Sequence, residues 1–296
     1  MADLAAPPIP GRGRGTDGRA PAPALTRDVV PVRNYGRGAF AVVVLGFVGM
    51  VCYGFATNPN IEWSVVEEFL FNVNILRGLL ATLKLTAVSM VLAVTGAVVI
   101  ALMRMSKSRI ISSVAAGYVF IFRGIPMILL IIFVGNIGLF LENIRIGVPA
   151  TDLTLVNVPV AEAITPFIAS VIGLSLAGAG YMAEIVRGGL LAIGRGQHEA
   201  AKALGVTSLQ TTRHIVLPQA LRIIVPPMGN ELIGMLKATA IVSVIAGGDL
   251  LTVAQSISGA NYRTIEMLIV AAVWYFVVLA VISVGQHFLE KRFAER

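Results

Sequence analysis

Three ionisable residues lie inside long apolar runs, where charge is costly and usually functional: Arg123, Glu184 and Lys237. An arginine can hold a carboxylate through two parallel hydrogen bonds, and a carboxylate can hold an ammonium group. We therefore expect Arg123 and Glu184, with Tyr181 packed beside them, to line a pathway for a small zwitterionic solute. Lys237 lies in the next apolar run, near Glu231. It either contacts the same solute or bridges two helices.

A purely structural interpretation of these charges stays open. Glu184 and Arg187 are separated by one helical turn in a predicted helix, so they could simply pair with each other. Arg187 would then lie near the inner membrane surface as an anchor. Asn230 and Glu231 fit the role of polar contacts between neighbouring helices.

No constellation of catalytic or metal-binding residues accompanies these charges. The sequence has 3 histidines, His198, His214 and His287, without metal-ligand spacing or a Cys or carboxylate partner pattern. It also lacks the phosphate loop G-x-x-x-x-G-K-[ST], since the glycine-rich segment at 11–18 has no Lys-Ser/Thr end. We therefore expect no catalytic residue, no metal and no cofactor in this chain. If ATP supplies energy, another polypeptide must bind it.

Composition places these residues in a membrane. Of the 296 residues, 56% are hydrophobic and 13% are charged, as in a polytopic membrane protein. The apolar runs are continuous and approach the ~20 residues of a spanning helix, whereas a β-barrel needs short alternating strands. The predicted fold class is an all-α polytopic membrane helix bundle. The lone Cys52 excludes an internal disulfide and fits a small packing residue.

Six spans are predicted, with both termini on the inner side of the membrane. They cover residues 39–56, 78–102, 110–141, 165–190, 219–246 and 264–289. The third is interrupted by RGIP at 123–126, and a straight helix of its length would measure ~48 Å. It must therefore tilt, kink at Pro126 or protrude. No internal repeat is apparent, which argues against a carrier built from inverted repeats.

The basic residues support this orientation. The formal net charge is +7, and much of the excess lies in the N-terminal tail and at the C-terminus. Basic residues that flank spans favour the cytoplasmic side, so this charge predicts orientation and no nucleic-acid partner. Residues 1–38, rich in Pro, Gly and Arg, are predicted to be a disordered basic tail. Contact with anionic membrane lipid is its alternative role.

A polar hairpin, residues 196–218, separates the fourth and fifth predicted spans. Its first half favours a helix, and Gly205 is placed for a left-handed C-terminal cap. Thr207 and Gln210 form a T-x-x-Q capping box for a second helix, and Pro218 is expected to mark that helix's end. Three alanines are expected to offer a small-residue surface to another body: Ala200, Ala201 and Ala203.

This polar hairpin resembles the EAA motif of bacterial ABC-importer permeases, in which it forms the coupling helix that docks on the ATPase subunit. The matching positions are Glu199, Ala200, Ala201, Gly205, Ile215, Leu217 and Pro218. FRGIP at 122–126, GYMAEIVRGG at 180–189 and the segment 217–245 resemble the polar amino-acid branch, the histidine and glutamine type. The resemblance covers about 78–292, a five-span core. Residues 1–38 and the span 39–56 look like an N-terminal addition.

The resemblance implies a permease subunit of an ATP-driven importer in the bacterial inner (plasma) membrane. The expected partners are ABC ATPase subunits, a second permease subunit (a copy or a paralogue), a periplasmic solute-binding protein and a polar amino acid as solute. The resemblance also implies that Arg123 and Glu184 line the amino-acid site. Family members commonly have polar side chains where this chain has Ile125, Leu130 and Ala238. These departures make a role as pathway wall, without direct substrate contact, an open alternative.

Two other functions compete with this one. An ion-gradient-driven secondary transporter would need no ATPase, and Glu184 and Glu231 would be its candidate proton relays. An intramembrane enzyme is disfavoured because the sequence shows no His/Asp/Ser or metal constellation.

Overall fold

The computed structural model describes residues 35–147 and 154–294. The chain divides into two compact units, Met1–Asn58 and Pro59–Arg296. The helices are α1 (Tyr35–Ala56), α2 (Trp63–Leu70), α3 (Val73–Arg104), α4 (Arg109–Gly124), α5 (Met127–Gly135), η1 (Ile137–Leu139), α6 (Val160–Ala163), α7 (Pro166–Leu191), α8 (Arg195–Ala203), α9 (Ser208–Thr211), η2 (Thr212–Val216), α10 (Leu217–Ala238), η3 (Thr239–Ile245), α11 (Leu250–Asn261) and α12 (Thr264–Ala294). The two strands, β1 (Asn143–Gly147) and β2 (Thr154–Pro159), form an antiparallel pair.

The described part of the first unit is the apolar helix α1. The predicted N-terminal span, 39–56, lies within this helix, whose residues 36–56 have the length and hydropathy of a membrane span. Its crossing of the membrane stays a prediction. The predicted basic tail, 1–38, falls almost entirely outside the described residues.

Five described helices are long and apolar enough to cross a membrane, and a sixth span results if α4 and α5 count together. This agrees with the prediction of about six spans. The helices α4 and α5 are bent by 100° at Ile125 and Pro126, so the kink is the solution adopted by the third span. Ile125 has extended backbone angles (φ −79°, ψ 133°) because the proline ring disfavours the helical conformation of the residue before it.

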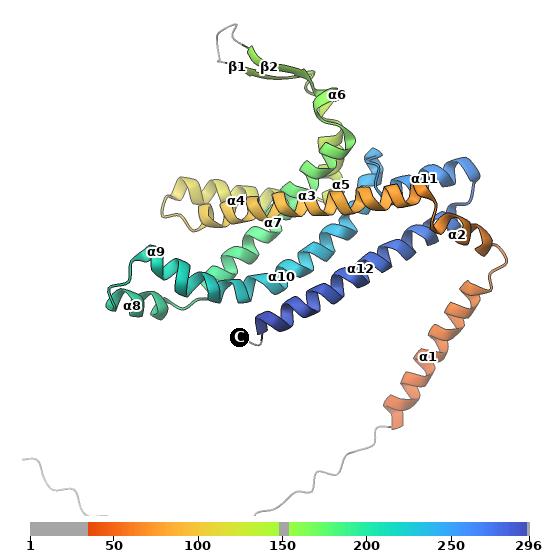
Figure 1. The fold of residues 1–296 in the computed structure, drawn as a ribbon, viewed down its shortest axis with the longest axis horizontal. Coiled ribbons are helices and arrows are strands. Elements are labelled where there is room, and N and C mark those ends of the chain that lie inside the picture. The colour runs from red at the N-terminus through yellow and green to blue at the C-terminus, as the bar shows by residue number, and fades with distance from the viewer. Residues whose placement is uncertain (1–34, 148–153, 295–296) are drawn as a thin grey trace, which may run out of the picture. The chain divides into compact units, whose positions relative to one another are not determined.

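Helix α7 is the centre of the second unit (Figure 1). It packs on α3, α4, α5 and α10, and 67% of its most apolar window is buried. Its small residues allow close approach: a Cβ added to Gly178 would lie 2.6 Å from the methyl carbon of Met235. The shared core includes Leu85 of α3, Ile131 of α5, Leu174 of α7 and Val242 of η3.

Replacing Gly189 with alanine should loosen the contact between α7 and α10. The new Cβ would lie 2.3 Å from Cγ1 of Ile224, so one helix must shift. Overpacking of this kind costs about 1–3 kcal/mol. Thermal unfolding in detergent should show a lowered midpoint for Gly189→Ala. The matched control is Gly188→Ala, whose Cβ meets nothing within 4 Å. Equal midpoints for the two variants would contradict this packing.

A second core joins α2, α11 and α12, at the right of Figure 1. Asp249 caps the N-terminus of α11 by accepting a hydrogen bond from the backbone N–H of Leu251 (3.0 Å), and Thr82 Oγ1 accepts from the N–H of Leu250 (2.9 Å). Trp274 Nε1 donates to the carbonyl of Leu70 (2.7 Å), which fixes α2 against α12. Three elements of the structure were not predicted from the sequence: α2, α11 and the β1–β2 hairpin.

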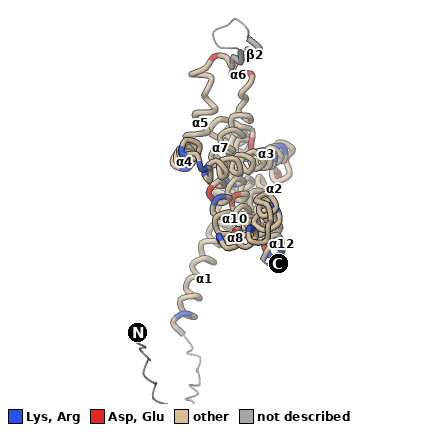
Figure 2. The backbone as a smooth tube through the Cα atoms, turned by 90° about the vertical axis from the view of Figure 1, so that its left-hand side faces the viewer, with Lys and Arg blue, Asp and Glu red and all other residues tan. Residues whose placement is uncertain are grey.

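The spanning helices of the second unit have their starts and ends on two opposite sides of that unit. The ends of α3 and α12 lie on the side that carries α8 and α9, while their starts lie on the side of α2 and α11 (Figure 1). Figure 2 looks onto the first of these sides and shows Lys and Arg gathered around α4, α8 and the C-terminal end of α12. That the polar hairpin lies on the inner side of the membrane stays a prediction.

Candidate functional site

The first turn of the polar hairpin is built as its sequence predicts. Helix α8 is followed by Gly205 in the left-handed region, with φ 73°. The N–H of Gly205 donates to the carbonyl of Lys202 (3.0 Å), and the N–H of Val206 donates to that of Ala201 (3.0 Å). This pair of hydrogen bonds is the Schellman arrangement, which requires a residue that tolerates positive φ. The predicted glycine cap is confirmed.

The second helix begins with the predicted capping box. Thr207 Oγ1 accepts from the N–H of Gln210 (3.4 Å), and Gln210 Oε1 accepts from the N–H of Thr207 (3.1 Å). These reciprocal bonds satisfy two backbone donors at the start of α9. The hairpin therefore has a fixed angle between α8 and α9.

The prediction that Pro218 ends this helix is wrong. Helix α9 continues through the π-turn η2 into α10, and Pro218 occupies the first turn of α10. The wider π-turn before it makes room for the proline ring, which itself lacks an N–H donor. Beside Pro218, which has no N–H, the side chain of Gln219 donates from Nε2 to the backbone carbonyl of Ile215 (2.8 Å). The polar hairpin is thus joined to a membrane span by continuous helix.

The outer surface of the polar hairpin differs from the predicted one. Ala200, Ala203 and Glu199 are exposed, but Ala201 is only 2% exposed and packs inside the hairpin. Alanine at that position keeps α8 close to the second arm of the hairpin, so the expectation that it faces another body is wrong. Two leucines missed by sequence reasoning form the apolar tip instead, Leu204 (81% exposed) and Leu209 (78%). Their flanking turn signals could have marked them as surface residues.

A cavity of about 530 Å³, here called the polar cavity, lies between α3, α4 and α7. Its lining comprises Arg104, Ala116, Val119, Phe120, Arg123, Gly124, Tyr181 and Glu184. The guanidinium of Arg123 lies 5.2 Å from the centre of the Tyr181 ring, within the range of a cation–π contact. The Tyr181 hydroxyl donates to the backbone carbonyl of Arg123 (3.3 Å). The structure therefore brings together the three predicted residues Arg123, Tyr181 and Glu184.

The carboxylate of Glu184 is held by arginines. Its Oε2 accepts from Nε (3.0 Å) and the terminal nitrogen (2.7 Å) of Arg187, as the structural interpretation of this pair predicted. Its Oε1 lies 3.4 Å from Nε of Arg104. With more arginines than carboxylates, the polar cavity is suited to bind an anionic group.

Removing the negative charge of Glu184 should destabilise the packing of α3 on α7. Glu184→Gln would leave Arg104 and Arg187 without their carboxylate partner, at side-chain exposures of 27% and 31%. We expect a loss of about 1–2 kcal/mol, seen as a lower thermal midpoint in detergent. Glu68→Gln, at an exposed position in α2, is the control. An unchanged midpoint for Glu184→Gln would contradict the structural role of this cluster.

Other predicted pathway residues lie elsewhere. Lys237 lines a separate, mainly apolar cavity of about 260 Å³ beside Tyr275, between α10 and α12. Neither Ile125 nor Leu130 lines the polar cavity, and Leu130 is 7% exposed in the core. These two positions are therefore not part of the polar cavity, and the expectation that they remove polar groups from the solute site stays a prediction. Ile125 lies at the 100° bend before α5, and Leu130 lies beyond it.

Comparison with known proteins identifies the family. Residues 74–295 match the family of binding-protein-dependent transport system inner membrane components. The chain belongs to this family of transport permeases. The arginine transport system permease protein ArgU of Corynebacterium glutamicum is 38% identical over 285 residues, which are 95% of this chain and 87% of the relative. The glutamate/aspartate import permease protein GltK of Escherichia coli is 32% identical over 79% of this chain and 98% of the relative.

Solved structures agree with the fold of this permease. A crystal structure of an amino acid ABC transporter with histidines has a TM-score of 0.63 and 34% identity, covering 74% of this chain and 94% of that chain. A methionine ABC transporter, at 20% identity and a TM-score of 0.56, shares the fold. The family segment starts at residue 74, so α1 and α2 precede it. The match to ArgU, over 95% of the chain, extends beyond this segment.

Proposed function

We propose that this permease is the membrane subunit of an ATP-driven importer of an amino acid. The observation that carries the proposal is the polar hairpin, a rigid turn with an apolar tip that continues into the span α10. A body that pushes on Leu204 and Leu209 would move α10 directly, because η2 forms no flexible break. Since the sequence has no phosphate loop, ATP is bound and hydrolysed by separate ABC ATPase subunits that dock on this tip.

We expect the amino acid to bind in the polar cavity, with its carboxylate held by arginine. Arg123 of α4 offers a planar pair of donors, and Arg104 of α3 adds positive charge to the lining. A volume of about 530 Å³ lies within the range of small-molecule sites. Similar permeases named for arginine and for glutamate/aspartate support an amino acid as the solute.

The polar cavity also supports a second permease subunit, a copy or a paralogue. Arg123 is exposed and Tyr181 is 39% exposed, so the cavity is open on one side. A charged residue in a spanning segment is costly against lipid, and a facing subunit would remove that cost. An extracytoplasmic binding protein would deliver the solute from the side of α2 and α11. The polar hairpin and both termini would lie in the cytoplasm of the bacterial cell.

Purification of the tagged chain from its native membrane in mild detergent tests this function. Mass spectrometry should find an ABC ATPase subunit in stoichiometric amount, together with a second permease chain or a second copy. The double variant Leu204→Asp, Leu209→Asp should lose the ATPase, because two charges replace the apolar tip. The matched control is Leu139→Asp, Leu141→Asp, at 82% and 52% exposure in and beside η1.

Recovery of the wild-type chain without any ATPase would reject the proposal. The ion-gradient-driven secondary transporter would then be the better description. If both double variants lost the ATPase equally, the tip would not be its docking surface.

A further inference from the structure

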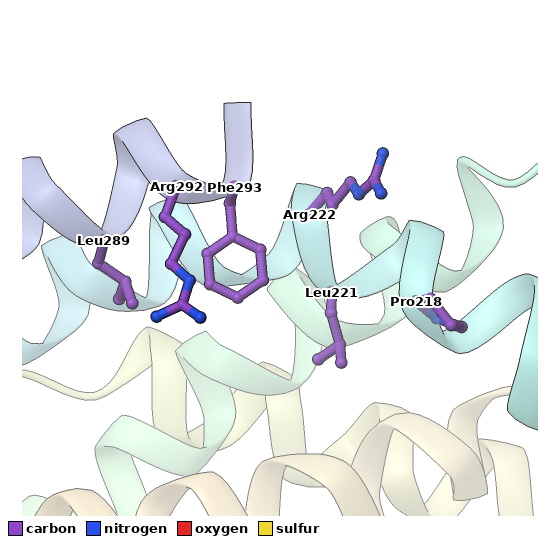
Figure 3. A pocket seen from close by; sticks show the side chains of 6 residues that line it. All are labelled: Pro218, Leu221, Arg222, Leu289, Arg292 and Phe293. Carbon is purple, nitrogen blue, oxygen red and sulfur yellow. The ribbon is translucent and has the colours of Figure 1, made fainter. Parts of the chain in front are cut away.

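A second charged cavity lies apart from the polar cavity, at the hairpin side of α10 and α12. Its volume is about 510 Å³. Figure 3 shows its lining residues, from the first turns of α10 and the last turns of α12: Pro218, Leu221, Arg222, Leu289, Arg292 and Phe293. This α10–α12 cavity includes one residue of the EAA motif, and the amino-acid pathway described above does not use it.

The lining of the α10–α12 cavity is amphiphilic. Leu221, Leu289 and Phe293 provide apolar wall, while Arg222 and Arg292 provide positive charge. In Figure 3 the guanidinium of Arg292 extends beside the ring of Phe293, and Arg222 lies on the other side of that ring. Within the described residues, no carboxylate forms an ion pair with Arg292. A ligand that fits both features has an anionic group and a hydrocarbon part.

The cavity lies where a membrane span ends. The candidate span of α12 covers Thr264–Phe293, so Arg292 is at its last turn. An exposed apolar stripe runs along α12 toward it at helical spacing: Val277 (45% exposed), Val281 (68%), Val284 (58%) and Phe288 (67%). Arg292 follows Phe288 by one further turn on the same face. An acyl chain could lie along this stripe while its headgroup reaches Arg292.

We propose that the α10–α12 cavity binds the phosphate of an anionic phospholipid from the cytoplasmic leaflet. Arginine holds phosphate through two parallel hydrogen bonds, and Arg292 is the principal ligand, with Arg222 supplying a second charge at the rim. The choice of leaflet rests on the proposed function, because the polar hairpin sets the orientation. A free phosphate ion would need no apolar wall. The stripe continues into the span and away from the tip of the polar hairpin, which favours lipid over the ATPase.

Native mass spectrometry of the full-length permease, purified without its partners, tests this site. The probe is phosphatidylglycerol, with phosphatidylcholine as the neutral lipid of similar chains. Wild-type protein should retain phosphatidylglycerol in preference to phosphatidylcholine. Arg222→Gln combined with Arg292→Gln should weaken that retention roughly tenfold or more, since each cation near anionic lipid contributes about 1 kcal/mol. Arg292→Lys, which keeps the charge and loses the paired donors, should show a smaller loss.

The matched control removes two cations from the same side of the permease. Lys107→Gln with Arg109→Gln changes two exposed residues, one just before α4 and one at its first position, that do not line the cavity. Equal retention by wild type and the Arg222/Arg292 variant, or an equal loss in the control, would overturn the proposal. Displacement of the lipid by millimolar inorganic phosphate would also overturn it in favour of a free-anion site.

A labelling experiment separates the lipid from the ATPase as occupant. A cysteine introduced as Leu289→Cys in a Cys52→Ser background should react equally with and without bound ATPase. Protection by the ATPase would assign the cavity to that partner and reject the lipid. Lipid retention is measured on the permease alone, so a permease that retains no lipid can still be tested for co-purification with the ATPase. Likewise, a permease that captures no ATPase can still be tested for lipid retention.

Discussion

Gly205→Val is expected to release the ATPase while the spans stay folded. A Cβ at this position meets nothing within 4 Å, so the substitution is limited by backbone conformation alone. At φ 73° an L-residue loses about 1–2 kcal/mol relative to glycine, and a β-branched residue is among the least tolerant. The turn should therefore rearrange and change the positions of Leu204 and Leu209, which lie on either side of it. Because about 1.4 kcal/mol corresponds to tenfold in affinity, ATPase capture should fall roughly tenfold.

Two controls distinguish the turn from a general effect of valine. Gly205→Asn should retain most of the capture, because asparagine tolerates the left-handed region. Gly194→Val places the same side chain at φ −56° and ψ 145°, with nothing within 4 Å of its Cβ, and should be near wild type. Capture that falls equally in all three variants, or in none, would show that the angle of this turn does not control docking.

The polar hairpin could be predicted residue by residue because its signals are local. Gly205, Thr207 and Gln210 act within a few positions of one another, and the backbone bonds they make are the ones that the sequence indicated. The prediction that Pro218 ends a helix failed for a different reason. Its effect depends on whether the preceding turn is α or π, and no residue type in the sequence decides between them.

The polar cavity could be predicted only in part because its contacts are non-local. Arg104 could not be assigned to this cavity from the sequence, because its distance to Glu184 is set by the packing of α3 on α7. Likewise, Ile125 and Leu130 were assigned to the cavity from their neighbourhood in sequence. Neither of them lines this cavity, and they lie at and beyond the 100° bend between α4 and α5.

The second core shows the same limit. Helix α11 is too short to be recognised as a span, and its start depends on Asp249, which is buried. Its burial raises the pKa of this carboxyl group, while the hydrogen bonds from Thr252 and Leu251 lower it. A buried acid at a helix start can be recognised as a cap only after its neighbours Thr82 and Leu250 are known.

Arg123→Gln is expected to weaken transport more than any other single change in the polar cavity. Arg123 is exposed and contacts Tyr181 through its side chain and through its backbone carbonyl, and among the described residues it forms no ion pair. Its guanidinium is therefore available to a carboxylate, whereas Arg187 is occupied by Glu184. Charged hydrogen bonds contribute about 1.5–3 kcal/mol, so the half-saturating solute concentration should rise roughly 10- to 100-fold. Uptake by the assembled complex in vesicles, with binding protein supplied, measures this.

The comparison of variants separates substrate contact from packing. Arg123→Lys keeps the charge without the planar pair of donors, so it should recover only part of the affinity. Tyr181→Phe keeps the ring under Arg123 and removes only the 3.3 Å hydrogen bond to a backbone carbonyl, so its uptake should stay close to wild type. Arg109→Gln, a loss of the same charge outside the cavity, should also leave uptake unchanged. If Arg123→Gln matched these last two variants, the polar cavity would be a wall of the pathway, and substrate would be held by the facing subunit.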